Sequence, residues 1–135
     1  MMADALTRGV HHVGLTVIDL EASCEFFTEI LGWERVGGDD DYPAVFVSDG
    51  VVMVTLWQAR EPSAATGFNK DKNTGLHHLA LKVADLDTLD RIYRKLVASA
   101  DIAIEFAPEP LRNGPAIHMM CREPGGIRIE FIVPG

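Results

Sequence analysis

The 135-residue chain lacks the features that mark several classes of protein. It has only two cysteines, Cys24 and Cys121, which argues against a disulfide-stapled scaffold and favours a reducing, cytoplasmic environment. Basic residues are the minority, with 12 Lys+Arg against 20 Asp+Glu and a net charge of −8, so we expect no nucleic-acid or anionic membrane partner. No apolar run approaches the roughly 20 residues of a membrane-spanning helix. The first residues also lack the apolar stretch of a secretory signal.

What the chain does contain is an internal repeat. The segment His11–Leu20, HHVGLTVIDL, returns nearly half a chain later as His77–Leu86, HHLALKVADL. An amphipathic helical pattern follows each copy, and each half closes on a strand-like segment that begins after glycine, Gly50–Leu56 in the first and Gly125–Phe131 in the second. The sequence therefore predicts a duplicated module, in which equivalent side chains of the two copies surround one shared centre.

Each module is predicted to have the element order β-α-β-β-β, which makes the chain a single α+β domain spanning residues 1–135. Module one covers about residues 9–58, a linker about 59–74, and module two about 75–133. The two predicted helices begin after Asp19 and Asp85, whose side chains suit an N-cap, and Gly32 ends the first. These helices are Leu20–Leu31 and Leu86–Ala98. The predicted strands are Val10–Val17, Trp33–Val36, Ala44–Val47, Val51–Trp57, Leu76–Val83, Ile102–Phe106, Ala116–Cys121 and Ile127–Val133.

Strand alternation predicts which side chains face away from the helices. His12 and His78 lie on that face of the two first strands, and Glu130 lies on it in the last strand. Two imidazoles and one carboxylate suit a divalent metal ion, and three protein ligands leave coordination positions open for substrate. A lone strand histidine is more often structural, but the symmetry of the pair favours a metal. His11 and His77 are assigned to the helix-facing side, as structural or supporting residues.

Other side chains share the predicted cavity face. His118 is either an acid–base group or substrate contact, or a hydrogen-bonded core histidine, and the sequence leaves both open. Met53, Thr55, Trp57, Met120 and Arg128 are the predicted pocket residues, although Trp57 and Met53 also fit a core role. Arg112 and Asn113, in a turn-like stretch, are candidates to orient a substrate carboxylate but fit an exposed, solvated loop better.

The motifs together resemble those of the vicinal oxygen chelate superfamily, which includes glyoxalase I, bleomycin-resistance proteins and type I extradiol dioxygenases. The resemblance spans about Val10 to Val133 and rests on the segments HVGLTVIDL, FFTEILG, GLHHLAL and EPGGIRIE. It implies paired βαβββ modules that form an open, barrel-like mixed sheet around a central cavity, with the helices outside. It also implies a homodimer, and it carries the family's metal positions to His12, His78 and Glu130.

The chain departs from the family at a fourth position. Glyoxalase-like and epimerase-like members have Glu or Gln on the last strand of module one, where the repeat places Thr55. A hydroxyl cannot take a proton from a carbon acid at neutral pH, so the glyoxalase reaction is disfavoured unless Glu130 acts as the base. The three-ligand set is similar to that of dioxygenases and fosfomycin transferases. However, Met120 replaces the dioxygenase tyrosine, and no basic cluster suits a phosphonate.

Two functional hypotheses follow. The first is an enzyme with one divalent metal ion (Fe, Ni, Zn, Mn or Co) that acts on a small oxygen-chelating substrate as a lyase, isomerase or ring-cleaving oxygenase, with Glu130 and His118 as catalytic residues. The second is a metal-free drug- or metabolite-binding protein of the bleomycin-resistance type, which the negative charge also fits. The three ligand residues favour the enzyme. Whether the modules pair within one chain or across a swapped dimer stays open.

Overall fold

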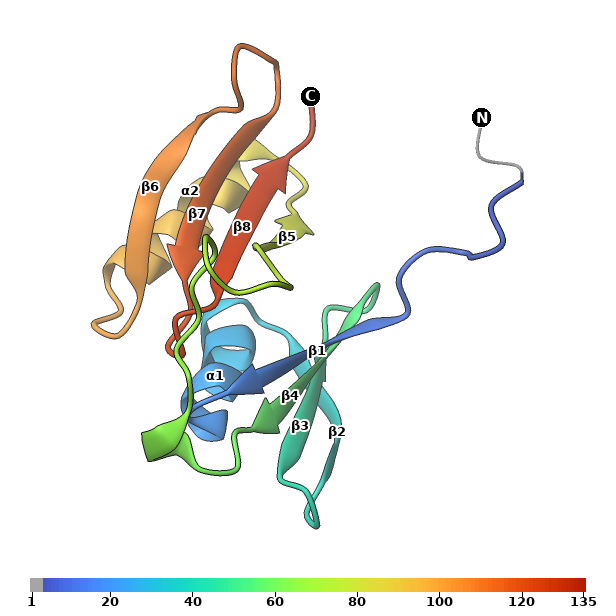
Figure 1. Ribbon diagram of the computed structural model, residues 1–135. Helices are drawn as coiled ribbons and strands as arrows, with labels where there is room; N and C mark the ends of the chain where they lie inside the picture. Colours follow the sequence, from blue (N-terminus) through green and yellow to red (C-terminus); the bar gives the residue numbers. More distant parts are fainter. Residues whose placement is uncertain (1–3) are drawn as a thin grey trace.

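The computed structural model describes residues 4–135 and contains two four-stranded sheets, one formed by each half of the chain (Figure 1). The strand order is β1-β4-β3-β2 in the first sheet and β5-β8-β7-β6 in the second. The first half contains β1 (His12–Val17), α1 (Leu20–Glu25), η1 (Phe26–Ile30), β2 (Glu34–Asp39), β3 (Ala44–Ser48) and β4 (Met53–Gln58). The second half contains β5 (Leu79–Lys82), α2 (Leu86–Val97), β6 (Ala103–Pro110), β7 (Ile117–Arg122) and β8 (Arg128–Val133), and the short 3-10 turn η2 (Pro62–Ala64) precedes it.

The duplication extends to the strand register. β1 runs parallel to β4 with Val13 opposite Val54, and β5 runs parallel to β8 with Leu79 opposite Ile129. The predicted α+β class, with two mixed sheets of the same topology, is thus confirmed. β1 and β5 each lie at the edge of their own sheet, so the two sheets form no closed barrel within residues 4–135.

Both helices begin where the sequence predicts. Asp19 Oδ1 accepts a 3.1 Å hydrogen bond from the Ala22 N–H, and Asp85 Oδ1 accepts one of 2.8 Å from the Thr88 N–H. These contacts satisfy backbone donors that a helix leaves free in its first turn. The first predicted helix divides into α1 and a wider π-helical turn, η1. It ends at Gly32, whose φ of 75° is readily adopted by glycine.

One hydrophobic core serves both modules. The alternating residues predicted to face the helices, such as Leu15, Leu56, Leu81 and Phe131, are buried and belong to a single cluster. α2 of the second module contacts η1 of the first, so the helices join the two halves. The apolar strand faces that point to the helices pack into this shared core, and the opposite faces carry the candidate site residues.

Two differences from the predicted elements affect the site. β5 begins at Leu79, so His77 and His78 precede the strand, and strand alternation does not apply to His77. The assignment of His11 and His77 to the helix-facing side was wrong, because both residues are exposed. β6 extends to Pro110 and has register shifts between Ile104 and Phe106 and between Phe106 and Glu109.

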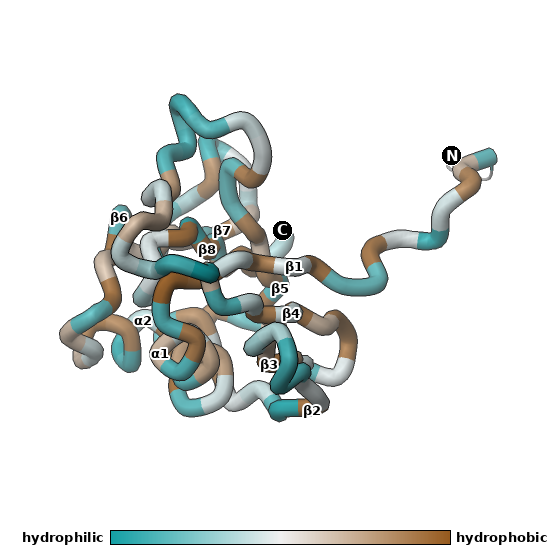
Figure 2. Tube along the Cα trace, turned by 60° about the horizontal axis from the view of Figure 1, so that its bottom comes forward, coloured by the Kyte–Doolittle hydropathy of each residue, from teal (hydrophilic) through white to brown (hydrophobic). Residues whose placement is uncertain are grey.

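The segment before β1 projects away from the two sheets in both views (Figures 1 and 2). Its apolar residues Leu6 and Val10 are 100% and 70% exposed. In the described part of the chain, no helix is long and apolar enough to span a membrane.

Candidate active site

A carboxylate held by two histidines lies at the centre of the second sheet. Glu130 of β8 is 8% exposed. Its Oε2 atom lies 2.6 Å from His118 Nδ1, and its Oε1 atom lies 3.0 Å from His78 Nε2. Three of the residues singled out from the sequence therefore meet at one point, from β7, β8 and the segment before β5.

The sheet register brings these residues together. β8 lies between β5 and β7, and Glu130 is opposite Ala80 on one side and Met120 on the other. His118 is two residues from Met120 and shares its face of the sheet. The ring of Phe106 packs against His118 with 4.8 Å between centroids, and Met120 is buried beside them. The carboxylate is thus flanked by the His118 ring, which packs on Phe106, and by the buried Met120.

The short contact fixes the role of each atom of His118. An ionised carboxylate only accepts hydrogen bonds, so His118 Nδ1–H is the donor to Glu130 Oε2. The Nε2 atom of His118 is then the ring nitrogen left to give or take a proton. An imidazole oriented in this way by a carboxylate is a common arrangement for general acid–base chemistry.

His12 does not join this cluster within the chain. It is exposed at the start of β1, in the other sheet, and its hydrogen-bond contact is with His11 at 2.9 Å between Nδ1 atoms. Among the described residues, no three His, Cys, Asp or Glu side chains are arranged to hold a metal ion. His12 and Glu130 lie in different sheets, and α2 of the second module packs against η1 of the first.

The predicted pocket residues of module one form a cluster of their own. Trp57 Nε1 donates a 2.9 Å hydrogen bond to Thr55 Oγ1, so this hydroxyl already has a partner. Tyr42 and Phe46 pack on the Trp57 ring, with centroids 5.3 and 5.8 Å away. Met53 is half-buried on the same strand. These side chains form an apolar wall on the sheet that carries His12.

Arg128 forms a second polar group beside Glu130. Its guanidinium donates to both carboxylate oxygens of Glu105, at 2.9 and 3.1 Å. The hydrogen bond from Arg128 lowers the pKa of Glu105 despite partial burial. Both residues, with Lys70 and Arg122, line a surface hollow of about 390 Å³.

Sequence reasoning missed Glu105 and Phe106, and the reason is geometric. Consecutive strand residues normally point to opposite faces, yet Glu105 contacts Arg128 and Phe106 contacts His118 on the same face. The register shift between Ile104 and Phe106 is a bulge that turns both side chains to one side. No local sequence signal marks that bulge.

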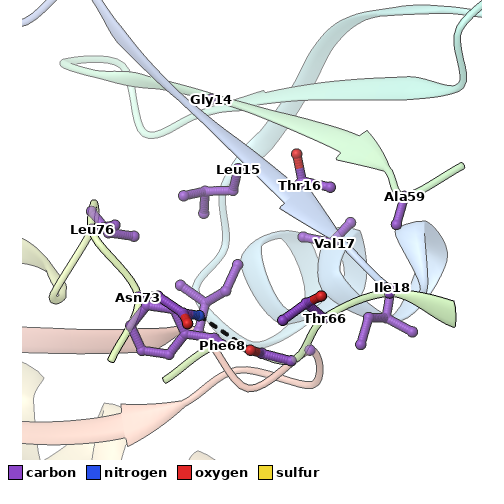
Figure 3. Close-up of a pocket in the computed structure, with 14 residues that line it drawn as sticks. Gly14, Leu15, Thr16, Val17, Ile18, Ala59, Thr66, Phe68, Asn73 and Leu76 are labelled. Carbon is purple, nitrogen blue, oxygen red and sulfur yellow. Dashed lines mark hydrogen bonds between the residues drawn. The ribbon is translucent and has the colours of Figure 1, made fainter. Parts of the chain in front are cut away.

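A separate cavity of about 270 Å³ lies between the two modules (Figure 3). The free edge of β1 and the linker from Ala65 to Leu76 contribute most of its lining, and Asn73 Nδ2 donates a 3.2 Å hydrogen bond to the Gly67 carbonyl within that linker. Its lining does not include His78, His118 or Glu130. Arg112 and Asn113 are exposed, with Arg112 at a positive φ of 57°, which agrees with a solvated turn.

Comparison with known proteins connects this geometry to a family. The profile of the Glyoxalase/Bleomycin resistance protein/Dioxygenase superfamily matches residues 9–131. A protein named 2-epi-5-epi-valiolone epimerase, from Actinomyces sp., is 28% identical, with 91% of this chain and 78% of that protein covered. The glyoxylase/bleomycin resistance protein/dioxygenase domain from Frankia sp. EAN1pec is 28% identical with a TM-score of 0.81, covering 96% of this chain and 99% of that one. Lactoylglutathione lyase from Agrobacterium tumefaciens, 23% identical over 96% of both chains, has the same fold with a TM-score of 0.71.

Proposed function

From the premise that the chain belongs to the Glyoxalase/Bleomycin resistance protein/Dioxygenase superfamily, we propose that it is a divalent-metal-dependent enzyme that moves a proton on a small, oxygen-rich substrate. The single observation that supports this most is the placement of Glu130 between two histidines, at 3.0 Å from His78 and 2.6 Å from His118. One histidine faces the carboxylate through a nitrogen that can bind a metal. The other is oriented to carry a proton.

The donor atoms fit a divalent cation. His78 Nε2 and Glu130 Oε1 are 3.0 Å apart, which is about the separation of two adjacent ligands that each lie roughly 2.1 Å from a metal ion. Nitrogen and oxygen donors of this kind suit Fe, Zn, Ni, Mn or Co. When bound, such an ion would act as a Lewis acid toward neighbouring oxygens of the substrate. His78 and Glu130 would hold it from one chain.

The third predicted ligand, His12, requires a second copy of the chain. We propose a homodimer in which the partner subunit's His12 joins His78 and Glu130. Two observations support this: His12 is exposed on an edge strand, and the segment before it leaves Leu6 and Val10 uncovered. Association through this segment would bury apolar surface and carry the His12 strand toward the polar face of the partner.

Proton transfer is assigned to His118, which touches Glu130 through Nδ1 and keeps Nε2 free for the substrate. Thr55 occupies the position where a second carboxylate would serve as base, and its hydroxyl accepts from Trp57. An enzyme of the epimerase type needs a group that removes a proton from one face of the carbon and a second donor, a side chain or water, that delivers a proton to the opposite face. His118 is proposed for one of these two transfers. The relative named as an epimerase is consistent with this reaction class.

Metal content is the decisive measurement. Protein purified anaerobically, without chelators or a histidine tag, is expected to carry about one equivalent of a divalent metal per site, measured by inductively coupled plasma mass spectrometry. Glu130→Ala is expected to abolish it. Glu29→Ala, which removes an exposed carboxylate in η1, is the matched control. Iron would favour oxygenation over proton transfer, and absence of metal after reconstitution would favour the metal-free binding protein.

The dimer is tested by mixing two inactive variants. If His12 and Glu130 of one site come from different subunits, a mixed dimer of His12→Ala and Glu130→Ala contains one intact site. Metal binding is then expected to return on mixing, although each variant alone has none. Failure to recover binding in mixed dimers would contradict the shared site. For activity, 2-epi-5-epi-valiolone is the first substrate to test, with solvent deuterium incorporation as the readout.

A further inference from the structure

Basic side chains from three segments gather around the surface hollow of about 390 Å³ that Glu105 lines. Lys70 comes from the linker between the modules, Arg122 from the end of β7 and Arg128 from the start of β8. The sequence shows no basic cluster, because no two of these residues are neighbours along the chain. Of the described residues that line the hollow, only Glu105 is acidic. Three positive charges and one negative charge leave a formal charge of +2, in a chain whose net charge is −8.

The sheet register places two of these cations directly opposite each other. Arg122 and Arg128 are partners across the antiparallel strands β7 and β8. Like charges in facing positions destabilise a sheet, and both oxygens of the Glu105 carboxylate already accept hydrogen bonds from Arg128. The fold does not require such a pair, because Ser48 faces Met53 at the corresponding place in module one. The two facing arginines are therefore specific to module two, and an anion bound between them would offset their repulsion.

Two of the cations keep N–H donors that a ligand could use. The Arg122 Nε atom lies 3.8 Å from Glu105 Oε2, which is too far for a hydrogen bond, and within residues 4–135 its guanidinium makes none. Lys70 Nζ lies 3.0 Å from Asp71 Oδ1, so one of its three donors is used, on an exposed carboxylate. Exposed ion pairs of this kind are weak. The pKa of Glu105 is lowered first by its hydrogen bond from Arg128 and further by the charges of Arg122 and Lys70, so all three cations act on one point.

We propose that this hollow binds the phosphate group of a small phosphorylated molecule. A phosphate monoester carries a charge of about −1.5 to −2 at pH 7, which matches the formal charge of the hollow, whereas a carboxylate carries a single charge. Arginine presents paired N–H groups to phosphate oxygens and lysine presents a point charge. Arg122 and Lys70 are therefore the contacting residues, and the buried Arg128 adds its charge. The volume of about 390 Å³ is within the range of small-molecule sites, which leaves room for more than the phosphate.

The hollow adjoins the candidate active site along one face of the second sheet. Arg128 and Glu130 are two residues apart in β8 and share that face, so their backbones are about 7 Å apart. On β7, Arg122 shares the same face with His118. A molecule whose phosphate contacts Arg122 and Lys70 can therefore extend its remaining atoms over this face toward Glu130. The identification of that molecule as the substrate rests on the proposed function, whereas the phosphate site itself does not.

The experiment is isothermal titration calorimetry on the metal-free full chain at low ionic strength, where ion pairs are screened least. The probes are phenyl phosphate, inorganic phosphate and acetate. The wild type is expected to bind phenyl phosphate at least as tightly as inorganic phosphate, and acetate at least tenfold more weakly. Arg122→Met and Lys70→Met should each weaken phenyl phosphate binding roughly tenfold, because a hydrogen bond between charged groups is lost.

Lys72→Met is the matched control. It removes an exposed lysine of the same linker that does not line the hollow, and it should bind phenyl phosphate as the wild type does. The Arg122 and Lys70 side chains are 52% and 37% exposed, so neither substitution disturbs the core. Circular dichroism checks the fold of each variant.

The outcomes separate this proposal from the proposed function. The phosphate site is overturned if the wild type binds no phenyl phosphate, if Arg122→Met and Lys70→Met bind it as the wild type does, or if acetate binds as tightly. Inorganic phosphate bound more tightly than phenyl phosphate would overturn the assignment to a phosphorylated molecule in favour of the free ion. If phenyl phosphate binds as expected but the wild type takes up no divalent metal, the phosphate site stands and the proposed metal enzyme fails.

Discussion

The Ser23 hydroxyl donates a 2.9 Å hydrogen bond to Glu123 Oε2, and both residues are fully buried. This contact ties α1 of the first module to the turn between β7 and β8 of the second. The Gly125 N–H donates to the same oxygen at 2.7 Å, while Oε1 has no hydrogen-bond partner in the described part of the chain. A single buried carboxylate is thus shared by the two halves of the duplication.

Removal of the Ser23 hydroxyl should weaken the contact between the two modules. Ser23→Ala is expected to lower the free energy of unfolding by about 1–3 kcal/mol, because a buried acceptor loses a donor that water does not replace. Urea denaturation followed by circular dichroism measures the change. Ser63→Ala, at an exposed position in η2, is the control and should be neutral. Equal midpoints for the two variants would show that the contact contributes nothing to stability.

Glu123 should also make stability depend on pH. Burial is the largest influence on this carboxyl and raises its pKa, although Gly125 and Ser23 oppose the shift by hydrogen bonding. As pH rises through the unfolded-state value of about 4.3, the unfolded chain releases the proton while the folded chain keeps it. Wild-type stability therefore falls with rising pH until the folded pKa is reached.

Glu123→Gln removes that proton equilibrium and keeps an acceptor for Ser23 and Gly125. The free energy of unfolding of Glu123→Gln, relative to that of the wild type, is expected to increase as pH rises from about 4. Urea titrations at several pH values measure this slope, and Glu29→Gln provides the exposed control. A pH-independent difference would mean that Glu123 has no raised pKa.

Periodicity made much of the fold predictable. The repeated HHxxLxV pattern identified the two modules, and the aspartates at positions 19 and 85 marked both helix starts, because N-capping depends on local sequence. Strand alternation also placed His118, Met120 and Glu130 on one face. These features depend on residues near one another in the chain, so a single sequence contains the information.

The remaining parts of the site depend on tertiary geometry. Alternation cannot anticipate the β6 bulge that turns Glu105 and Phe106 to the same face. The predicted convergence of His12 with His78 requires the two sheets to surround one cavity, whereas His12 lies in the first sheet and His78 contacts Glu130 of the second. Arg128 contacts His77, which precedes β5 and therefore lies outside the strand alternation. Such features arise when elements pack, and no short pattern encodes them.

Both thiols should be inert in the folded protein. Cys121 is fully buried, and burial, with the nearby charges of Glu123 and Glu105, raises its pKa to about 12. Burial also raises the pKa of Cys24. At pH 8 only about one Cys121 in ten thousand would be the reactive thiolate. A disulfide reagent such as DTNB is expected to label neither cysteine until urea is added, and rapid labelling of the native protein would contradict this.

The contact between His118 and Glu130 allows orientation and proton transfer to be separated. His118→Phe leaves the buried Glu130 oxygen without its donor, so the free energy of unfolding should fall by about 1–3 kcal/mol. His118→Gln keeps an N–H donor near that oxygen and should recover most of this loss. Neither variant has an imidazole to exchange a proton, so deuterium incorporation into substrate should fall by roughly 10²- to 10⁴-fold in both. Metal stoichiometry should stay at the wild-type level, because His118 is not a proposed ligand. Full activity in His118→Gln would show that His118 only orients Glu130 and that another group carries the proton.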